Sequence, residues 1–159
     1  MGIILHQFDF YRLRDGNYFE SAILIAEKTL VNSEKLLIVA PESELSDLSY
    51  RFWSEKTDSF LAHGMGIEDV SDYAPIWLST LVQDNPISAD YVMLTNGASL
   101  EDFSSFKRVF NLFDGSSQIA MEQTRNQWRN WSANPDHLCR YFTQSETGTW
   151  QHIASNTKE

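Results

Sequence analysis

The stretch Lys35-Leu36-Leu37-Ile38-Val39-Ala40, which ends at Pro41, is the part of the sequence that decides the fold. Its apolar residues follow one another without a polar break, which is typical of an interior strand covered on both faces of a parallel sheet. Short apolar runs of this kind alternate with helical patterns along the chain, and that alternation is typical of α/β proteins. The stretch therefore predicts a sheet with helices on both sides.

The residues before this strand predict a second strand and a helix. Residues 2–13 alternate, with Ile3, Leu5 and Gln7 on one side and aromatic or branched side chains on the other. Asn17, with Glu20 three residues later, resembles a capping box and predicts the start of a helix. The predicted buried stripe of this helix consists of Phe19, Ala22, Ile23, Ala26 and Leu30.

Strand, helix and strand in this order form a βαβ unit, in which the two strands run parallel. The sequence thus predicts an α/β fold, a three-layer α/β/α sandwich with a mainly parallel central sheet. This fold is Rossmann-like, but we expect no nucleotide site, because the turn after the first strand has a single glycine, Gly16.

The remaining elements are predicted from the same patterns of apolar and breaker residues. We expect one domain over residues 1–154 and a polar C-terminal tail over residues 155–159. The predicted elements are a helix to about Trp53, a loop holding Gly64 and Gly66, strands at Ile76–Leu81, Ala89–Thr95 and Arg108–Phe113, a short helix at Glu101–Phe106, a long helix capped by Ser116 or Ser117 and ending near Ser132, and a closing strand at His137–Gln144.

Composition and charge limit the classes of partner. The 159 residues are 42% hydrophobic and 13% aromatic, which is enough to build a globular core. Twenty-two acidic and twelve basic side chains give a net charge of -10, and this sign opposes direct binding to nucleic acid or to an anionic membrane surface. Cys139 is the single cysteine, and residues 1–13 lack the pattern of an export signal, so we expect a cytoplasmic protein.

The sequence offers no recognisable catalytic or metal site. The four histidines, His6, His63, His137 and His152, stand singly, without the spacings that place two metal ligands on one element. No nucleophile elbow is present, and the carboxylates lie mostly in predicted loops. We therefore expect no cofactor and no catalysis. A small enzyme stays an alternative, and a polar pocket near Asp9, Ala40 and Thr95 would favour it.

The long predicted helix carries a candidate binding strip. Met121, Arg125 and Arg129 lie four residues apart on one side, with Trp128 beside them, while Ile119, Ala120, Thr124 and Trp131 can face the sheet. Two guanidinium groups beside an aromatic wall suit a short peptide with a hydrophobic last residue and a free carboxylate. The alternative is that the arginines form solvated pairs with nearby acids and that Trp128 fills the core.

Several motifs, in this order, resemble the chi-subunit family of bacterial DNA polymerase III. They are Phe52-Trp53, the stretch 58–64 (Asp-Ser-Phe-Leu-Ala-His-Gly), the stretch 109–115 (Val-Phe-Asn-Leu-Phe-Asp-Gly), the stretch 125–129 (Arg-Asn-Gln-Trp-Arg), Tyr141-Phe142-Thr143-Gln144 and Gly148-Thr149-Trp150. The resemblance implies a non-catalytic, replisome-associated subunit in the bacterial cytoplasm. Its implied partners are the acidic C-terminal tail of single-strand DNA-binding protein and the psi subunit or another clamp-loader component.

The resemblance also implies which residues bind each partner. Arg125 and Arg129 match the basic positions of the tail site and Trp128 its aromatic position, with Arg125 pairing with the terminal carboxylate. Met121 stands where the family has a further basic residue, so part of the electrostatic contribution is absent or is supplied elsewhere. Trp53 and Phe60 match the aromatic positions that face psi. The remaining alternative is another protein-binding α/β adaptor domain.

Overall fold

The apolar run at residues 35–40 forms the centre of one half of the sheet. The structure is a computed structural model, and it describes residues 5–15, 17–54, 63–65, 75–81, 85–95, 105–147 and 149–156, with the backbone alone at 52–54 and 63–65. The run forms β2 (Leu36–Val39), which lies between β4 (Ile76–Ser79) and β5 (Tyr91–Thr95) and is parallel to both. All four residues of β2 are buried, as expected for an interior strand.

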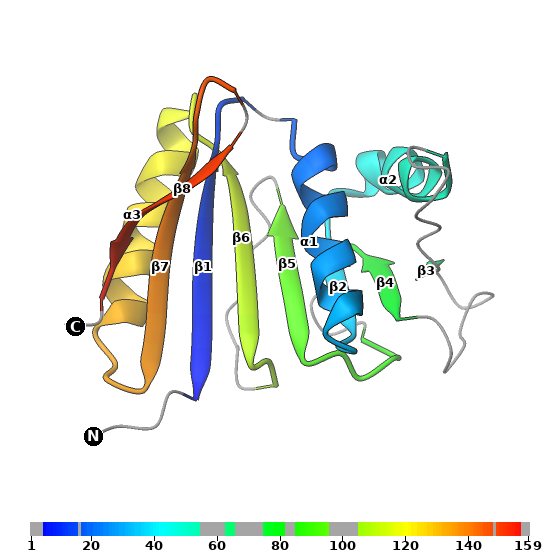
Figure 1. The fold of residues 1–159 in the computed structure, drawn as a ribbon, viewed down its shortest axis with the longest axis horizontal. Helices are drawn as coiled ribbons and strands as arrows, with labels where there is room; N and C mark the ends of the chain where they lie inside the picture. Colours follow the sequence, from blue (N-terminus) through cyan, green and yellow to red (C-terminus); the bar gives the residue numbers. More distant parts are fainter. Residues whose placement is uncertain are drawn as a thin grey trace.

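The sheet has eight strands in the order β3-β4-β2-β5-β6-β1-β7-β8 (Figure 1). Its other members are β1 (His6–Leu13), β3 (His63–Met65), β6 (Arg108–Asp114), β7 (His137–Gln144) and β8 (Trp150–Ser155). Every neighbouring pair is parallel except β7 and β8. β1 and β2 run parallel, as predicted, but β5 and β6 lie between them.

Helices cover both faces of the sheet, which confirms the predicted three-layer α/β sandwich. Helices α1 (Phe19–Val31) and α2 (Glu42–Ser54) lie on one face, and α3 (Gln118–Ser132) lies on the other (Figure 1). α1 covers the half of the sheet around β2, β5 and β6, whereas α3 packs on β6 and β7. The two layers of helix are therefore offset along the sheet.

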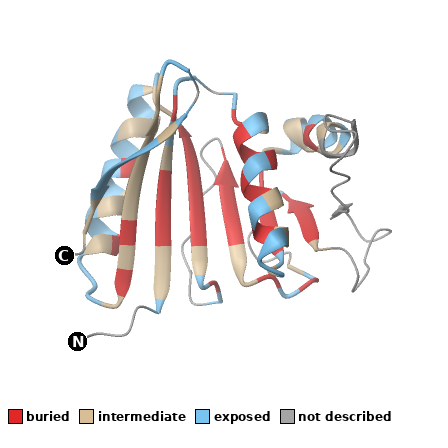
Figure 2. Cartoon of the chain, in the orientation of Figure 1, coloured by how far each residue is buried: buried red, intermediate tan, exposed pale blue. Residues whose placement is uncertain are grey.

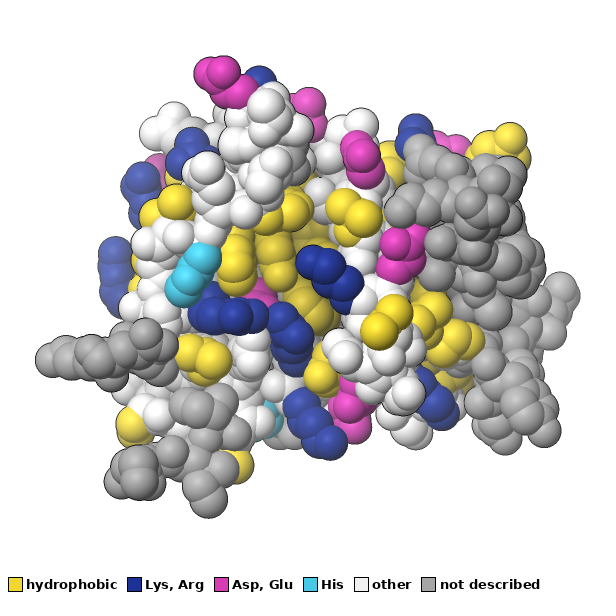
Figure 3. All heavy atoms as spheres, viewed as in Figure 1, with side chains coloured by type: hydrophobic (Ala, Val, Ile, Leu, Met, Phe, Trp, Pro, Cys, Tyr) yellow, Lys and Arg dark blue, Asp and Glu magenta, His cyan; other side chains and the backbone are white. Residues whose placement is uncertain are grey.

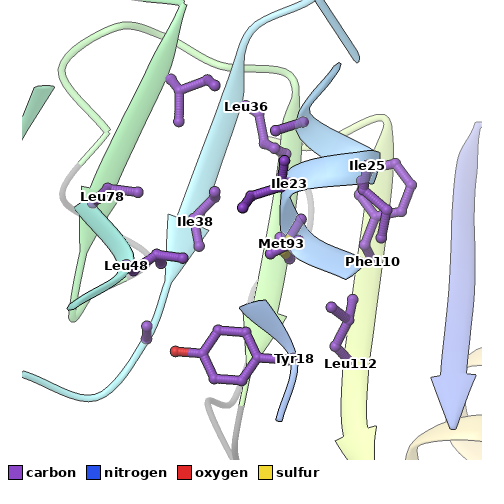
Figure 4. Packing of buried hydrophobic residues seen from close by; sticks show 14 of the residues in the cluster. Tyr18, Ile23, Ile25, Leu36, Ile38, Leu48, Leu78, Met93, Phe110 and Leu112 are labelled. Carbon is purple, nitrogen blue, oxygen red and sulfur yellow. The ribbon is translucent and has the colours of Figure 1, made fainter. Parts of the chain in front are cut away.

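Each face of the sheet has its own hydrophobic core. Side chains from α1, α2 and alternate strand positions form the first core, in which Ile23, Leu48, Met93 and Phe110 converge (Figure 4). The second core, on the α3 face, includes Phe8, Phe10 and Trp131. Burial is concentrated in the middle of the strands and on the sheet-facing side of the helices (Figure 2).

The start of α3 agrees with the prediction, whereas the start of α1 differs from it. Ser117 caps α3, as predicted, because its side chain accepts a hydrogen bond from the backbone N–H of Ala120 at 3.2 Å. α1 does not begin with the predicted capping box. Its N-cap is Tyr18, which makes no side-chain cap hydrogen bond, and Asn17 accepts a hydrogen bond from Phe19 N at 3.4 Å instead.

Two short edge strands were missed in the sequence. Gly64 lies in β3 rather than in a loop, and β8 follows β7 as the antiparallel edge of the sheet. Most of β8 is exposed, so it lacks the apolar alternation by which a strand is recognised. β8 ends at Ser155, and Asn156 bonds to Cys139 N and to His137 O, so the chain follows the sheet to residue 156. Most of the predicted helix at 101–106 lies outside the described residues.

Candidate functional site

The side of α3 that faces the sheet is fixed by both apolar and polar contacts. Trp131 is buried and stacks on Phe8, with ring centroids 4.4 Å apart, and Thr124 is buried beside it on the helix. Asn111 of β6 donates a hydrogen bond to Gln127 at 2.6 Å. Ile119 was predicted to face the sheet, but it is 71% exposed, because the helical periodicity places it on the side of α3 away from Thr124 and Trp131.

One flank of α3, together with the neighbouring strands, borders a groove of about 710 Å³, here called the α3 groove. Met121, Arg125, Trp128 and Arg129, which were singled out in the sequence, all line it. Thr124 and Ser132 of α3 and residues of β1, β6, β7 and β8 supply the rest of the lining. The complete set is Arg12, Phe113, Met121, Thr124, Arg125, Trp128, Arg129, Ser132, Tyr141 and Ala154.

Trp128 forms part of the groove wall and part of the core. It is half-buried, and its ring lies 5.4 Å from that of Phe10 and 6.4 Å, edge to face, from that of Tyr141. Met121 is also half-buried and packs against the same core. The apolar wall is therefore held in place before any ligand arrives, which lowers the entropic cost of binding.

Arg125 and Arg129 are exposed at the rim of the groove. The salt bridges Lys107–Asp90, Arg108–Asp9 and Arg140–Asp9 lie away from α3, and neither Arg125 nor Arg129 pairs with a carboxylate of the described residues. The two guanidinium groups can thus form paired hydrogen bonds with a carboxylate, while the wall takes an apolar side chain. This combination suits the carboxyl-terminal end of an acidic peptide.

Sequence reasoning missed the residues that the strands contribute to the groove. Arg12 on β1 is the most important of these, because it adds a third cation. Arg12 lies two residues beyond Phe10 and four beyond Phe8, so the alternation of β1 places all three side chains on the α3 face. The alternation shows which side chains of β1 share a face with Arg12, but it does not show that α3 covers that face.

A second charged cluster lies on the opposite face of β1. Asp9 is fully buried, and it accepts hydrogen bonds from Arg108 at 2.6 and 3.1 Å and from Arg140 at 2.9 Å. Basic side chains lie beside hydrophobic ones on this face, between α1 and β8 (Figure 3). The hydrogen bond with Asp9 raises the pKa of Arg140, and burial raises the pKa of Tyr11, the next residue on this face, to about 12.

A polar pocket near Asp9, Ala40 and Thr95 would favour the enzyme alternative, but the contacts of these three residues within the described part of the chain give it no support. Asp9 lies in the middle of β1 rather than at a carboxyl end, and its carboxylate forms salt bridges with Arg108 and Arg140. Ala40 and Thr95 are buried, and Thr95 donates its hydroxyl hydrogen to Val39 O at 2.9 Å. The side chain of Cys139 is buried, and burial raises its pKa to about 12, so its thiol stays protonated at neutral pH.

The two residues assigned to the psi-facing surface stay untested. Phe60 lies outside the described residues, and Trp53 belongs to the last turn of α2, where the backbone alone is described. The described residues hold no group of three or more side chains that could bind a metal ion. None of their helices has both the length and the apolar character needed to cross a membrane.

The sequence matches the model of a known protein family. Residues 5–135, well over half of the chain, match the family model described as DNA polymerase III chi subunit, HolC. No curated protein matches the sequence. The matched region includes α3 and the strands β1 and β6, and therefore most of the lining of the α3 groove.

Proposed function

Because the chain belongs to the family of DNA polymerase III chi subunits, accessory subunits of the replicative polymerase, we propose that its α3 groove holds the acidic C-terminal tail of single-strand DNA-binding protein. Through this contact the chain links single-strand DNA-binding protein to the clamp-loader complex during DNA replication. Its place of action is then the replication fork in the bacterial cytoplasm.

One observation supports this proposal above all: the α3 groove combines positively charged and apolar side chains. Arg125 and Arg129 supply positive charge at the rim, and Met121 and Trp128 supply an apolar wall. A peptide that ends in a hydrophobic residue offers both complements, with its side chain against the wall and its terminal carboxylate on Arg125. Acidic residues before it lie within the field of the other cations.

The link to the clamp loader rests on family membership and on two aromatic residues. Trp53 and Phe60 match the positions that face psi in this family, and psi or another clamp-loader component is the proposed partner. Aromatic side chains of this size are typical anchors at protein interfaces. The two proposed surfaces come from different parts of the chain, α2 with the residues after it and α3, so one chain can hold both partners.

A non-catalytic role fits the polar groups of the described core. The Cys139 thiol is a poor nucleophile, because the thiolate is the reactive form and burial raises the pKa. The carboxylate of Asp9 is occupied by two guanidinium groups. The net charge of -10 opposes direct contact with nucleic acid, so the proposed route to DNA runs through the single-strand DNA-binding protein.

Fluorescence anisotropy with a labelled tail peptide tests the tail site. The peptide is titrated with the wild-type chain, with Arg125→Ala and with Lys28→Ala, at low and at moderate salt. Lys28 is a matched control, since it is an exposed cation on α1, which covers the other face of the sheet. Circular dichroism of each variant shows whether the fold is intact.

We expect micromolar binding by the wild-type chain and by Lys28→Ala. Loss of a charge-assisted, paired hydrogen bond costs roughly 2 kcal/mol, so Arg125→Ala should bind about 30-fold more weakly. Binding should also weaken as salt rises, because the contact is electrostatic. Equal binding by the wild-type chain and Arg125→Ala would refute the proposed site.

A further inference from the structure

A second groove lies at the carboxyl ends of β1, β6 and β7 and shares one lining residue with the α3 groove. The second groove has a volume of about 300 Å³ and is lined by residues of β1 and β7 and of the turns that follow β1 and β6. Arg12 lines both grooves. The lining of the second groove is Arg12, Leu13, Arg14, Gly115, Thr143 and Gln144.

The second groove is positively charged. Arg12 and Arg14 are both exposed, and their hydrogen bonds go to backbone carbonyl groups, from Arg12 to Gly115 O at 3.4 Å and from Arg14 to Glu146 O at 2.8 Å. Neither arginine takes part in a salt bridge with a carboxylate of the described residues. Each guanidinium group therefore keeps donors for an anion.

The acidic residues near this groove are partly engaged with their own turns. Asp114 accepts hydrogen bonds from the backbone and the hydroxyl group of Ser116, at 2.8 and 2.6 Å. Asp15 accepts one from Asn17 N at 2.8 Å. Both carboxylates thus accept hydrogen bonds within the turns at the ends of β6 and β1. Neither of them forms a salt bridge with Arg12 or Arg14.

Gly115 sets the path of the Arg12 side chain between the two grooves. A Cβ atom at this position would lie 2.6 Å from Cγ and 2.7 Å from Nε of Arg12, and 2.5 Å from the carbonyl oxygen of Leu13. The Arg12 side chain therefore lies directly against the backbone of residue 115. Any side chain at position 115 would displace the Arg12 side chain, so the observed conformation of Arg12 depends on the glycine.

We propose that Arg12 and Arg14 form a second, anion-binding part of the tail site, which holds acidic residues that precede the hydrophobic end of the peptide. This proposal rests on the proposed function of the α3 groove. Arg12 supplies positive charge in a groove where Met121 is uncharged, and Arg14 extends the charge along the carboxyl ends of the strands. The occupant is an extended acidic peptide that is longer than the α3 groove alone requires.

Two peptides separate this part of the site from the first. The short peptide has about three residues and ends in a hydrophobic residue with a free carboxylate, and the long peptide adds about four aspartates before it. Both are titrated into the wild-type chain, Arg12→Gln, Arg14→Gln and the control Lys28→Gln at low salt. The quantity compared is the ratio of the two affinities, long over short.

The proposal predicts that the wild-type chain prefers the long peptide and that Arg14→Gln lowers this preference about three-fold without changing the affinity for the short one. Arg12→Gln weakens both peptides, because Arg12 lines both grooves. Lys28→Gln changes neither value. Removal of one exposed cation has effects of this size.

An unchanged preference in both Arg12→Gln and Arg14→Gln would overturn the second part of the site. The proposed function would survive that result, since the short peptide would still bind and would still depend on Arg125. If neither peptide binds the wild-type chain, the proposed function fails, and the second part of the site fails with it.

Discussion

The side-chain amide of Asn111 donates a hydrogen bond to the side-chain oxygen of Gln127 across 2.6 Å, from the middle of β6 to the third turn of α3. Asn111 is a buried polar residue in an otherwise apolar row of β6. Because the bond forms only at one rotation of α3 about its axis, it helps to fix which residues of the helix face outward. Arg125, Trp128 and Arg129 reach the α3 groove at that rotation.

Loss of this bond should lower stability. In Asn111→Ala the side chain of Gln127 loses a buried partner, and we expect the free energy of unfolding to fall by about 1–2 kcal/mol. Urea denaturation measures this change. Asn126→Ala is the matched control, because Asn126 is exposed on the same helix and should change stability by less than about 0.5 kcal/mol. Equal effects of the two substitutions would mean that the bond does not orient α3.

Removal of the Asp9 carboxylate charge should lower the free energy of unfolding by more than loss of the Asn111–Gln127 bond. Asp9→Asn leaves Arg108 and Arg140 facing each other without the carboxylate that joins them, and each is only partly exposed, at 26% and 30%. We expect a loss of about 2–4 kcal/mol, discounted from the cost of breaking a fully buried pair. The exposed pair Lys107–Asp90 is the control, and Asp90→Asn should cost less than about 1 kcal/mol. Similar losses in the two variants would contradict this account of the Asp9 cluster.

Stability should fall in alkaline solution because of buried groups that resist ionisation. Burial raises the pKa of Cys139 from its ordinary 9.0 to about 12, and that of Tyr18 from 10.0 to about 12. The unfolded chain therefore releases these protons at a lower pH than the folded chain. The stability contributed by the neutral forms is fully present below about pH 9 and is lost as the pH rises toward about 12.

The Cys139 share of this loss can be isolated. Between about pH 8 and pH 10.5 the thiol alone should lower the free energy of unfolding by about 2 kcal/mol. Cys139→Ala is expected to be less stable at neutral pH because it leaves a small cavity, but its stability should decline less steeply over this range. Urea titrations under reducing conditions give both slopes. Parallel slopes for the two proteins would show that the thiol does not titrate as its burial requires.

The two proposed binding surfaces should be separable by mutation. Trp53→Ala together with Phe60→Ala should remove binding to psi, or to the clamp-loader component that takes its place, and should leave the affinity for the tail peptide unchanged. Arg125→Ala should have the opposite effect. Pull-down of psi and anisotropy of the tail peptide, applied to both variants, measure the two activities. A variant that loses both while its circular dichroism is unchanged would show that the surfaces are one site.

The sequence predicted the layers of the fold because these depend on local patterns. β2 was recognised by its uninterrupted apolar residues and α3 by its cap at Ser117 and the buried positions Thr124 and Trp131. The family match over residues 5–135 confirms the resemblance to chi subunits. The edge strand β8 was missed, because a strand that is mostly exposed has no apolar face to detect.

The part of the candidate site that lies on α3 was also predicted, because it too depends on a local pattern. Met121, Arg125, Trp128 and Arg129 are spaced on one helix, so their proximity follows from helical geometry. Arg12 and Tyr141 join them only because β1 lies between β6 and β7, and the order of strands in a sheet is a property of the whole fold. Local patterns carry no information about that order. The cation supplied by β1 could therefore be seen only in the structure.

Binding to the intact partner tests the central claim most directly. Full-length single-strand DNA-binding protein and the same protein without its acidic C-terminal tail are each titrated into the wild-type chain by calorimetry, at low and at moderate salt. The account predicts micromolar binding of the intact protein that weakens as salt rises, and no binding of the truncated protein. Equal binding of the two proteins would contradict it, because the contact would then not be made by the tail.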